Sequence, residues 1–347
     1  RAIPRTVLNG LFKTIGEWVY YAQQGGIASY SADIDYAAGR LVSSGNVFYV
    51  CVQANGPSSS VIAPGSDTDY WQLLPNIGDV TSLITSTINN LSIFDLCPDG
   101  AAQHNALYRG KDITSLFDSG EFSTNVANGT FKDIFPGDYI DKPITISGTT
   151  YDAKWIIGDL DHMFNYGDTA LEEHHCAIFP DLALGTSYMN STNITTDAYK
   201  GSYMYLTKLP PVRTAISNLF GASHLCNFRL YLTKTINTSY ASMAGTGWTG
   251  ASSAAEWTDC TVELMSENQV YGSKLSSSRL DRHDTPHIMA AFQHNPTLRF
   301  NDLENNRYTW WLRDVVSSAN FAVALSSGHA GSHSASNVHG VRPFCLI

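Results

Sequence analysis

The sequence predicts an α+β fold made of several modules along a chain of 347 residues. Apolar residues recur at helical spacing near the start, and most of the remainder consists of short β-rich runs separated by Gly, Ser and Asn turns. The hydrophobic share of 43% is ample for buried cores, and the length fits two or three domains. We expect a helix at 1–27, a small all-β module at 28–76, a short coiled-coil helix at 77–95 and a larger mixed domain at 96–347.

Charge and cysteine usage exclude several classes of protein. The formal net charge of −10 argues against nucleic acid or an anionic membrane surface as a partner. No apolar run reaches the roughly 18 residues that a membrane span needs, and the first residues show no signal-peptide pattern. Six cysteines lie far apart without a CxxC pair, so we expect buried thiols rather than zinc or thioredoxin chemistry.

The first segment, residues 1–27, has one apolar helical face. Because so short a helix is marginal alone, the face needs a partner surface. That surface belongs either to another protein or to the domain that follows. The residues at three- and four-residue steps are Leu8, Leu11, Phe12, Ile15, Trp18 and Val19.

The second segment, residues 28–76, is expected to be a small β module. Val47–Cys51 is a β-rich run that follows a turn of Ser, Ser, Gly and Asn. Together with Tyr36-Ala-Ala-Gly-Arg-Leu-Val it resembles small carbohydrate-binding modules of the chitin-binding type. That resemblance implies sugar stacking on Tyr49, Tyr70 or Trp71. The alternative is that Trp71 forms the core and the module is a spacer.

The third segment carries two and a half heptads. Isoleucine at position a favours more than two strands, so we expect a parallel homotrimer, with flanking domains supplying further stability. The alternative is one amphipathic helix that links two domains of a monomer. The heptad places Ile77, Ile84 and Leu91 at a, and Val80, Thr87 and Phe94 at d.

The large domain, residues 96–347, mixes helices and strands. We expect its best helix at 209–220, ended by Gly221, and a surface insertion at 231–258 rich in Gly, Ser, Thr and Ala. Residues 259–271 are expected to form a buried strand or helix. Shorter helices are expected at 112–120 and 123–129, and strands at 137–140, 143–146 and 155–158.

The last forty residues contain two segments that we expect to be rigid, separated by a middle segment of restricted composition. Trp310 and Trp311 bury well, with Arg313 and Asp314 expected to brace one another. The run 341–347 is of β type. The middle, 315–339, contains only Val, Ser, Ala, Asn, Phe, Leu, Gly and His.

That restricted composition has two interpretations. Randomising the two adenines of AAY codons yields these residue types and never yields Lys, Glu, Gln, Met or Trp. The alternative is an ordinary Ser/Gly/Ala-rich surface loop.

The pattern WWLRD…SSANFA…GVRP resembles the C-terminus of variable proteins made by diversity-generating retroelements, which carry a C-type-lectin-like fold. Earlier motifs support the resemblance, and the N-terminal helix is similar to the attachment end of phage tail fibres. These motifs are Tyr108-Arg-Gly-Lys-Asp-Ile, Gly129-Thr-Phe-Lys-Asp-Ile-Phe-Pro-Gly-Asp-Tyr-Ile, His174-His175 with Phe179-Pro-Asp, Met189-Asn-Ser-Thr-Asn-Ile-Thr-Thr, and Val262-Glu-Leu-Met-Ser-Glu.

The resemblance implies a ligand-binding face made of rewritten positions on a fixed scaffold. Small hydroxyls, histidines and apolar groups would give it an antibody-like mixture. Trp310, Trp311, Arg313, Val341, Arg342 and Phe344 are assigned to the frame, and Ala322, Ala324, Gly328, Ala330 and Gly340 to the scaffold between the variable positions. The candidate ligand-binding residues are Asn320, Phe321, Val323, Leu325, Ser326, Ser327, His329, Ser332, His333, Asn337 and His339.

The densest titratable cluster lies at residues 159–175. Its carboxylates and histidines are compatible with glycosidic acid–base chemistry or a divalent cation, but nothing in the sequence fixes their separation, and we interpret them as structural. A second group of histidines near 283–294 matches no metal spacing. Since no GxSxG, P-loop or HExxH motif occurs, we expect no enzyme activity, metal or cofactor. The cluster comprises Asp159, Asp161, His162, Glu172, Glu173, His174 and His175.

The expected function is that of a phage tail receptor-binding protein in the virion tail. Its partners would be a host surface protein or glycan, other tail proteins at the N-terminus, and two further copies of the chain. A depolymerase of host surface polysaccharide that uses the 159–175 cluster, and a bacterial surface adhesin, are the alternatives.

Overall fold

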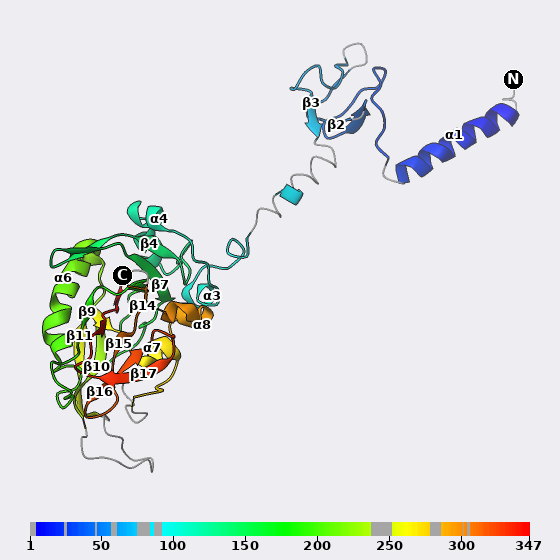
Figure 1. Ribbon diagram of the computed structural model, residues 1–347. Coiled ribbons are helices and arrows are strands. Elements are labelled where there is room, and N and C mark those ends of the chain that lie inside the picture. The colour runs from blue at the N-terminus through cyan, green and yellow to red at the C-terminus, as the bar shows by residue number, and fades with distance from the viewer. Residues whose placement is uncertain are drawn as a thin grey trace. The chain divides into compact units, whose positions relative to one another are not determined.

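The computed structural model describes residues 5–23, 26–45, 47–56, 61–74, 84–86, 92–236, 252–277, 286–300, 302–303 and 306–347. These form two compact units, residues 1–92 and residues 93–347 (Figure 1). The unit boundary falls inside the segment 77–95, where the sequence predicts a coiled coil. Among the described residues, no helix is long and apolar enough to span a lipid bilayer.

The first unit contains one long helix and a three-stranded antiparallel sheet. In the helix α1, Leu11, Phe12 and Ile15 of the predicted apolar face are exposed to solvent. The sheet packs on Trp71, which is 2% exposed, so the core interpretation of this tryptophan is confirmed. The elements are α1 (Arg5–Gln23), β1 (Leu41–Ser44), β2 (Val47–Cys51) and β3 (Trp71–Leu74).

Most of the predicted heptad lies outside the described residues. Residues 84–86 are helical, with Ile84 exposed. Phe94 belongs to a turn and stacks edge-on against Phe135 at 5.0 Å between ring centroids. The predicted helix therefore does not extend to Phe94, whose side chain packs on Phe135 in the second unit.

The second unit has the α+β composition that the sequence predicts. Residues 209–220 form the helix α6, which buries Leu209, Val212, Ile216 and Phe220 and is followed by Gly221, as expected. Its helices are α3 (Ala101–His104), α4 (Thr114–Asp118), α5 (Glu121–Ala127), the π-helix η2 (Met204–Lys208), α6 (Leu209–Phe220), the 3-10 helix η3 (Ala222–His224), α7 (Glu267–Tyr271), α8 (Ala290–His294) and the 3-10 helix η4 (Pro296–Arg299).

Two five-stranded sheets organise this unit. One has the order β12-β19-β8-β7-β4 and is antiparallel throughout; the other has the order β17-β16-β15-β18-β9, in which β15 and β18 run parallel. The strands are β4 (Tyr139–Asp141), β5 (Ile144–Ile146), β6 (Thr149–Tyr151), β7 (Lys154–Leu160), β8 (Cys176–Pro180), β9 (Thr186–Ser187), β10 (Phe228–Ile236), β11 (Ser252–Cys260), β12 (Val262–Leu264), β13 (Asp302–Leu303), β14 (Asn306–Arg307), β15 (Trp310–Val315), β16 (Asn320–Ala324), β17 (Ala330–Ser334), β18 (His339–Gly340) and β19 (Pro343–Leu346).

The expectation of a surface insertion at 231–258 is wrong for its described part. β10 and β11 pair as a long antiparallel hairpin from Phe228↔Cys260 to Ile236↔Ser252. Alternate residues of β10, among them Leu230 and Leu232, are buried in the main core. Residues 259–271, predicted to form either a strand or a helix, contain both β12 and α7.

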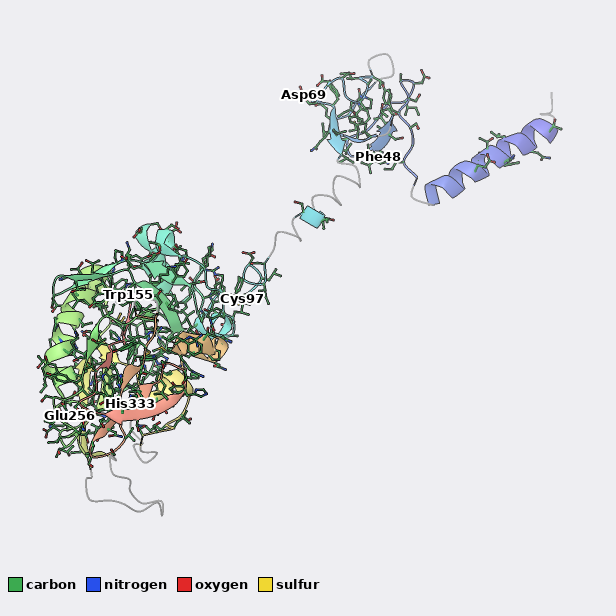
Figure 2. All side chains as sticks on the ribbon, in the orientation of Figure 1. Phe48, Asp69, Cys97, Trp155, Glu256 and His333 are labelled. Atoms are coloured by element: carbon green, nitrogen blue, oxygen red, sulfur yellow. The ribbon has the colours of Figure 1, made fainter. Side chains whose placement is uncertain are left out.

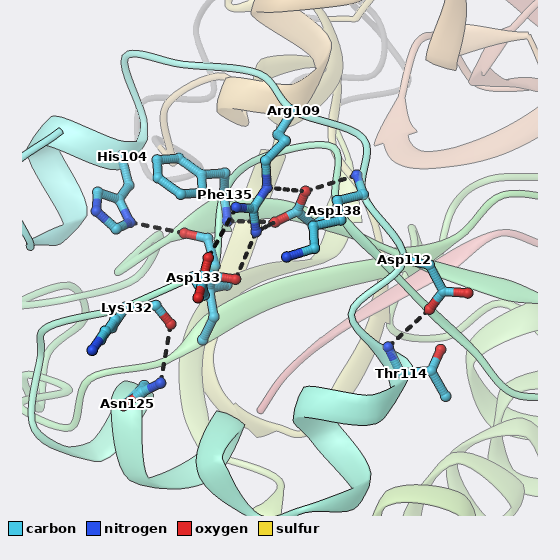
Figure 3. Close-up of polar contacts among 11 residues, drawn as sticks. His104, Arg109, Asp112, Thr114, Asn125, Lys132, Asp133, Phe135 and Asp138 are labelled. Carbon is cyan, nitrogen blue, oxygen red and sulfur yellow. Dashed lines mark hydrogen bonds and ion pairs between the residues drawn. The ribbon is translucent and has the colours of Figure 1, made fainter. Parts of the chain in front are cut away.

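Two of the early motifs, 108–113 and 129–140, meet around one buried ion pair (Figure 3). Arg109 donates through Nε and Nη2 to both carboxylate oxygens of Asp138, at 3.0 and 2.8 Å, and also binds Asp133. Its guanidinium lies over the ring of Phe135, 4.6 Å from the centroid. Because Asp138 is 0% exposed, this bidentate pair fixes two distant loops together.

All six cysteines are described and unpaired. Four are buried, while Cys97 and Cys226 are half-buried. Burial raises the pKa of Cys226 to about 11 and that of Cys176 well above its usual range. The expectation of buried thiols is therefore confirmed for four of the six.

Candidate functional site

The frame of the candidate binding face is buried. Trp310 and Trp311 of β15 are 0% exposed, and each indole N–H donates to a backbone carbonyl, that of Arg299 and that of Ser187. Arg342 is 1% exposed and donates to the carbonyls of Pro180 and Leu298, both at 2.7 Å. The predicted frame residues thus hold β15, β18 and β19 against the core.

Arg313 and Asp314 are buried next to the frame, and each has partners from the β12–α7 region. Arg313 Nη1 donates to the carbonyl of Leu264. Asp314 accepts from the Glu267 amide at 2.6 Å and from Lys274 at 3.1 Å. These contacts fasten β15 to α7.

Strand β17 is the edge of its sheet, and all five of its residues are half-buried. It pairs with β16 from Asn320↔Ser334 to Ala324↔Ala330. Its residue His333 is labelled in Figure 2. An edge strand of this kind can offer side chains and unpaired backbone groups to a ligand.

The predicted binding residues fall into three groups by exposure. Ser326, Ser327, His329 and Asn337 are exposed. The half-buried ones are Asn320, Leu325, Ser332, His333 and His339.

Phe321 and Val323 form the third group and are a correction. Both are 0% exposed and belong to the main core. β16 lies between β15 and β17, with both of its faces covered, so its apolar side chains stabilise the sheet and are not available to a ligand.

Two histidines meet on the face. His333 Nδ1 lies 2.6 Å from His339 Nε2, and the ring of His339 packs edge-on against Trp311 at 4.7 Å. Burial, and then the proximity of His333, lower the pKa of His339 to about 4. Burial therefore favours the neutral form of His339.

The turn between β16 and β17 is fixed by contacts with Phe300 and Tyr271. Gly328 has a φ of 80°, and a Cβ there would lie 2.8 Å from the Phe300 ring. The Tyr271 hydroxyl donates to the Gly328 carbonyl, and Leu325 packs over Gly331. Glycine at 328 is thus required by conformation and by space, while Ser326 and Ser327 beside it stay exposed.

The sequence did not assign segment 187–204 to this face, yet it borders the face. The backbone amides of Met189 and Asn190 both donate to the Ala335 carbonyl at 3.0 Å. Asn193 Oδ1 accepts from the amide and the hydroxyl of Ser336. Thr195 Oγ1 donates to the Ser317 carbonyl at 2.6 Å. These contacts tie the segment to the open end of the β16–β17 pair, opposite the turn that joins the two strands.

The titratable cluster at 159–175 forms two separate groups. Asp161 binds His174 at 2.8 Å, and His175 Nε2 accepts from the Met163 amide at 2.9 Å. Burial lowers the pKa of His175 to about 4. These contacts brace the turn between β7 and β8, in keeping with a structural role.

The second group joins Asp159 to two histidines. Asp159 Oδ2 lies 2.7 Å from His162 Nδ1 and 2.7 Å from His287 Nε2. Burial opposes the ionisation of Asp159, but the bonds from both imidazoles outweigh it and lower its pKa. Hydrogen bonding to Asp159 raises the pKa of the exposed His287, whereas burial lowers that of His162. The sequence missed this contact, since 128 residues separate the partners.

The donor atoms of Asp159, His162 and His287 lie within 4.8 Å of one another, as a metal site requires. Gln269 opposes that use. Its Oε1 accepts from Arg313 Nη1 at 2.6 Å, which turns its amide nitrogen toward His162 Nε2 at 3.1 Å. His162 Nε2 must therefore accept, and the ring proton lies on Nδ1, where a metal would have to bind. The arrangement favours a hydrogen-bonded chain from Arg313 to His287.

Of the other predicted histidine positions, His294 binds the Asn105 carbonyl at 2.8 Å. Residues 281–285, which include His283, lie outside the described part of the chain.

Residues 226–347 match the family model of a domain of unknown function, DUF6273. The match runs from just before β10 to the end of β19 and so contains the whole β15–β16–β17 face and its frame. No curated protein matches the chain. No solved structure matches it either.

Proposed function

We propose that this chain is a receptor-binding protein of a phage tail, located in the virion tail, which recognises a host cell-surface ligand. The recognising part is a C-type-lectin-like domain at 96–347. The observation that carries the proposal is a contrast within the C-terminal segment. Trp310, Trp311 and Arg342 are buried, whereas the loops on either side of β17 expose Ser326, Ser327, His329 and Asn337. A fixed frame under short polar side chains allows the surface to change without loss of the fold.

The first unit supports attachment rather than recognition. Leu11, Phe12 and Ile15 expose an apolar helical stripe, the kind of surface that docks on another protein. We assign it to contacts with other tail proteins. The heptad segment as far as Leu91 is assigned to a parallel homotrimer, without Phe94, which packs on Phe135. A molecular mass measured in solution tests the trimer, which a persistent monomer at high concentration would exclude.

We assign the chain a role in binding and none in catalysis. Asp159, the most enclosed carboxylate of the 159–175 cluster, is engaged by His162, His287 and the amide of Leu160. A carboxylate with both oxygens occupied is poorly placed to exchange protons with a substrate.

The test is binding of the fluorescently labelled full-length chain to a panel of intact bacterial strains. A face variant changes Ser326, Ser327, His329 and Asn337 to alanine. A control variant likewise changes Ser115, Thr124 and Lys132 to alanine. These residues are exposed and lie at the α4–α5 end of the same unit, far from β16 and β17 in Figure 1.

We expect wild type and control to bind the same strains and the face variant to lose at least about tenfold in affinity, a loss typical of removing a few central contacts. Equal binding by all three proteins would contradict the proposal. Release of soluble saccharide from bound cells by the wild type would favour the depolymerase alternative.

A further inference from the structure

Two tyrosines form an aromatic platform beside the candidate face. The ring centroids of Tyr188 and Tyr203 lie 4.7 Å apart with an interplanar angle of 40°. Tyr203 is 39% exposed and Tyr188 is half-buried. The backbone that carries them is fixed, because Asn190 accepts from the Tyr203 amide at 2.9 Å and donates to the Ile194 carbonyl at 2.7 Å.

The platform is continuous with the face. Ser187, directly before Tyr188, pairs with His339 across β9 and β18. The Ser187 carbonyl also accepts the indole N–H of Trp311 at 2.8 Å. The platform and the histidine pair are therefore supported by the same buried tryptophan.

The rim of the platform, residues 187–196, is neutral and mostly polar, and its apolar Ile194 is 55% exposed. Residues 187–196 read Ser-Tyr-Met-Asn-Ser-Thr-Asn-Ile-Thr-Thr, with no charged residue. Ser191, Thr192, Asn193 and Thr196 are exposed there and supply hydroxyl and amide groups. The adjoining η2 is a π-helix, a conformation often found at functional sites.

We propose that Tyr188 and Tyr203, with this rim, bind one neutral pyranose ring of a surface glycan. A pyranose has an apolar C–H face that packs on an aromatic ring, and its hydroxyls need neutral donors and acceptors at the edge. This inference rests on the proposed receptor-binding function and narrows its ligand class to a saccharide.

The test uses saturation-transfer NMR on the full-length chain with methyl pyranosides of glucose, galactose, N-acetylglucosamine and rhamnose as probes. The variants are Tyr203→Ala, which removes a ring, and Tyr203→Trp, which keeps a stacking surface. Leu206→Ala is the matched control, since Leu206 is an exposed apolar residue of η2, 61% accessible.

We expect transfer from the wild type to the ring protons of at least one probe. Tyr203→Ala should weaken binding about tenfold, the loss of one aromatic contact, while Tyr203→Trp and Leu206→Ala keep it. No transfer to any probe in the wild type, or equal transfer in Tyr203→Ala, would overturn the inference.

Cell binding separates this inference from the proposed function. If Tyr203→Ala binds the bacterial panel like the wild type and the face variant does not, the platform is wrong and the receptor-binding proposal stands. Cell binding that protease treatment of the cells abolishes and periodate oxidation of their glycans leaves intact would identify a protein ligand and overturn the saccharide assignment alone.

Discussion

His333 and His339 face each other across six residues of chain, with Nδ1 of the first 2.6 Å from Nε2 of the second. At this distance one imidazole donates and the other accepts. His339 also rests against Trp311, so the hydrogen bond joins the edge strand β17 to the buried frame. Because burial lowers the pKa of His339, we expect the stability of the face to depend on pH.

The free energy of unfolding should depend on pH through His339. An unfolded histidine has a pKa of about 6.5, and the folded value is about 4. Between these values the unfolded chain binds a proton that the folded chain does not, so the free energy of unfolding falls on acidification through this window.

In His339→Gln that contribution disappears. The stability difference between wild type and variant should therefore shrink by on the order of 1–2 kcal/mol from pH 7 to pH 4.5, allowing for partial exposure. Urea unfolding at both pH values measures it. His175 titrates equally in both proteins and cancels; a difference that does not change with pH would refute the assignment.

Arg342→Met should destabilise the second unit by about 2–5 kcal/mol, because a buried and a part-buried carbonyl lose a charged donor. The side chain also lies 4.9 Å from the ring centroid of Phe179 and 5.1 Å from that of Trp310. Urea unfolding followed by tryptophan fluorescence checks this. Lys132→Met, at an exposed position, is the control and should change stability by less than about 0.5 kcal/mol.

Asp159→Asn should lower the pKa of His287, because the hydrogen bond to that carboxylate is the main cause of its raised value. A histidine whose pKa is raised by folding stabilises the folded state at pH values below its unfolded pKa. That contribution is lost as the pH rises through the folded pKa. NMR titration of the imidazole protons measures the shift. His339 lies outside this network and should keep its pKa of about 4; an unchanged His287 would rule out the Asp159 contact.

Exposure should decide which candidate positions tolerate substitution. Phe321→Ala should cost about 3–5 kcal/mol, as for other large side chains removed from a core. His329→Ala, on the exposed turn, should stay within about 0.5 kcal/mol. Thermal unfolding of both variants compares them. If Phe321→Ala is as stable as His329→Ala, the placement of β16 inside the sheet is incorrect.

The sequence predicts well those features that depend on local pattern. The helix at 209–220 follows from apolar residues at three- and four-residue steps and from Gly221 after it. The burial of Trp310 and Trp311 follows from their size. The burial of Phe321 and Val323 does not follow from the sequence, because residue composition does not reveal whether a strand is covered on both faces.

The features that the sequence does not predict depend on contacts between residues far apart in the chain. The amides of Met189 and Asn190 bind the carbonyl of Ala335, more than a hundred residues later, and no local pattern records such pairing. The Gly, Ser and Thr content of residues 231–258 likewise predicts a loop, although their described part belongs to the β10–β11 hairpin. The only hint of the platform was the uncharged run at 187–196.

The central claim, that a fixed buried frame carries a diversified exposed face, is tested most directly by deep sequencing. The codons for residues 308–347 would be read across a propagated population of the source genome. We predict changes at the codons for Ser326, Ser327, His329 and Asn337, with those for Trp310, Trp311, Arg342 and Pro343 unchanged. An invariant segment, or changes spread equally over frame and face, would contradict the claim.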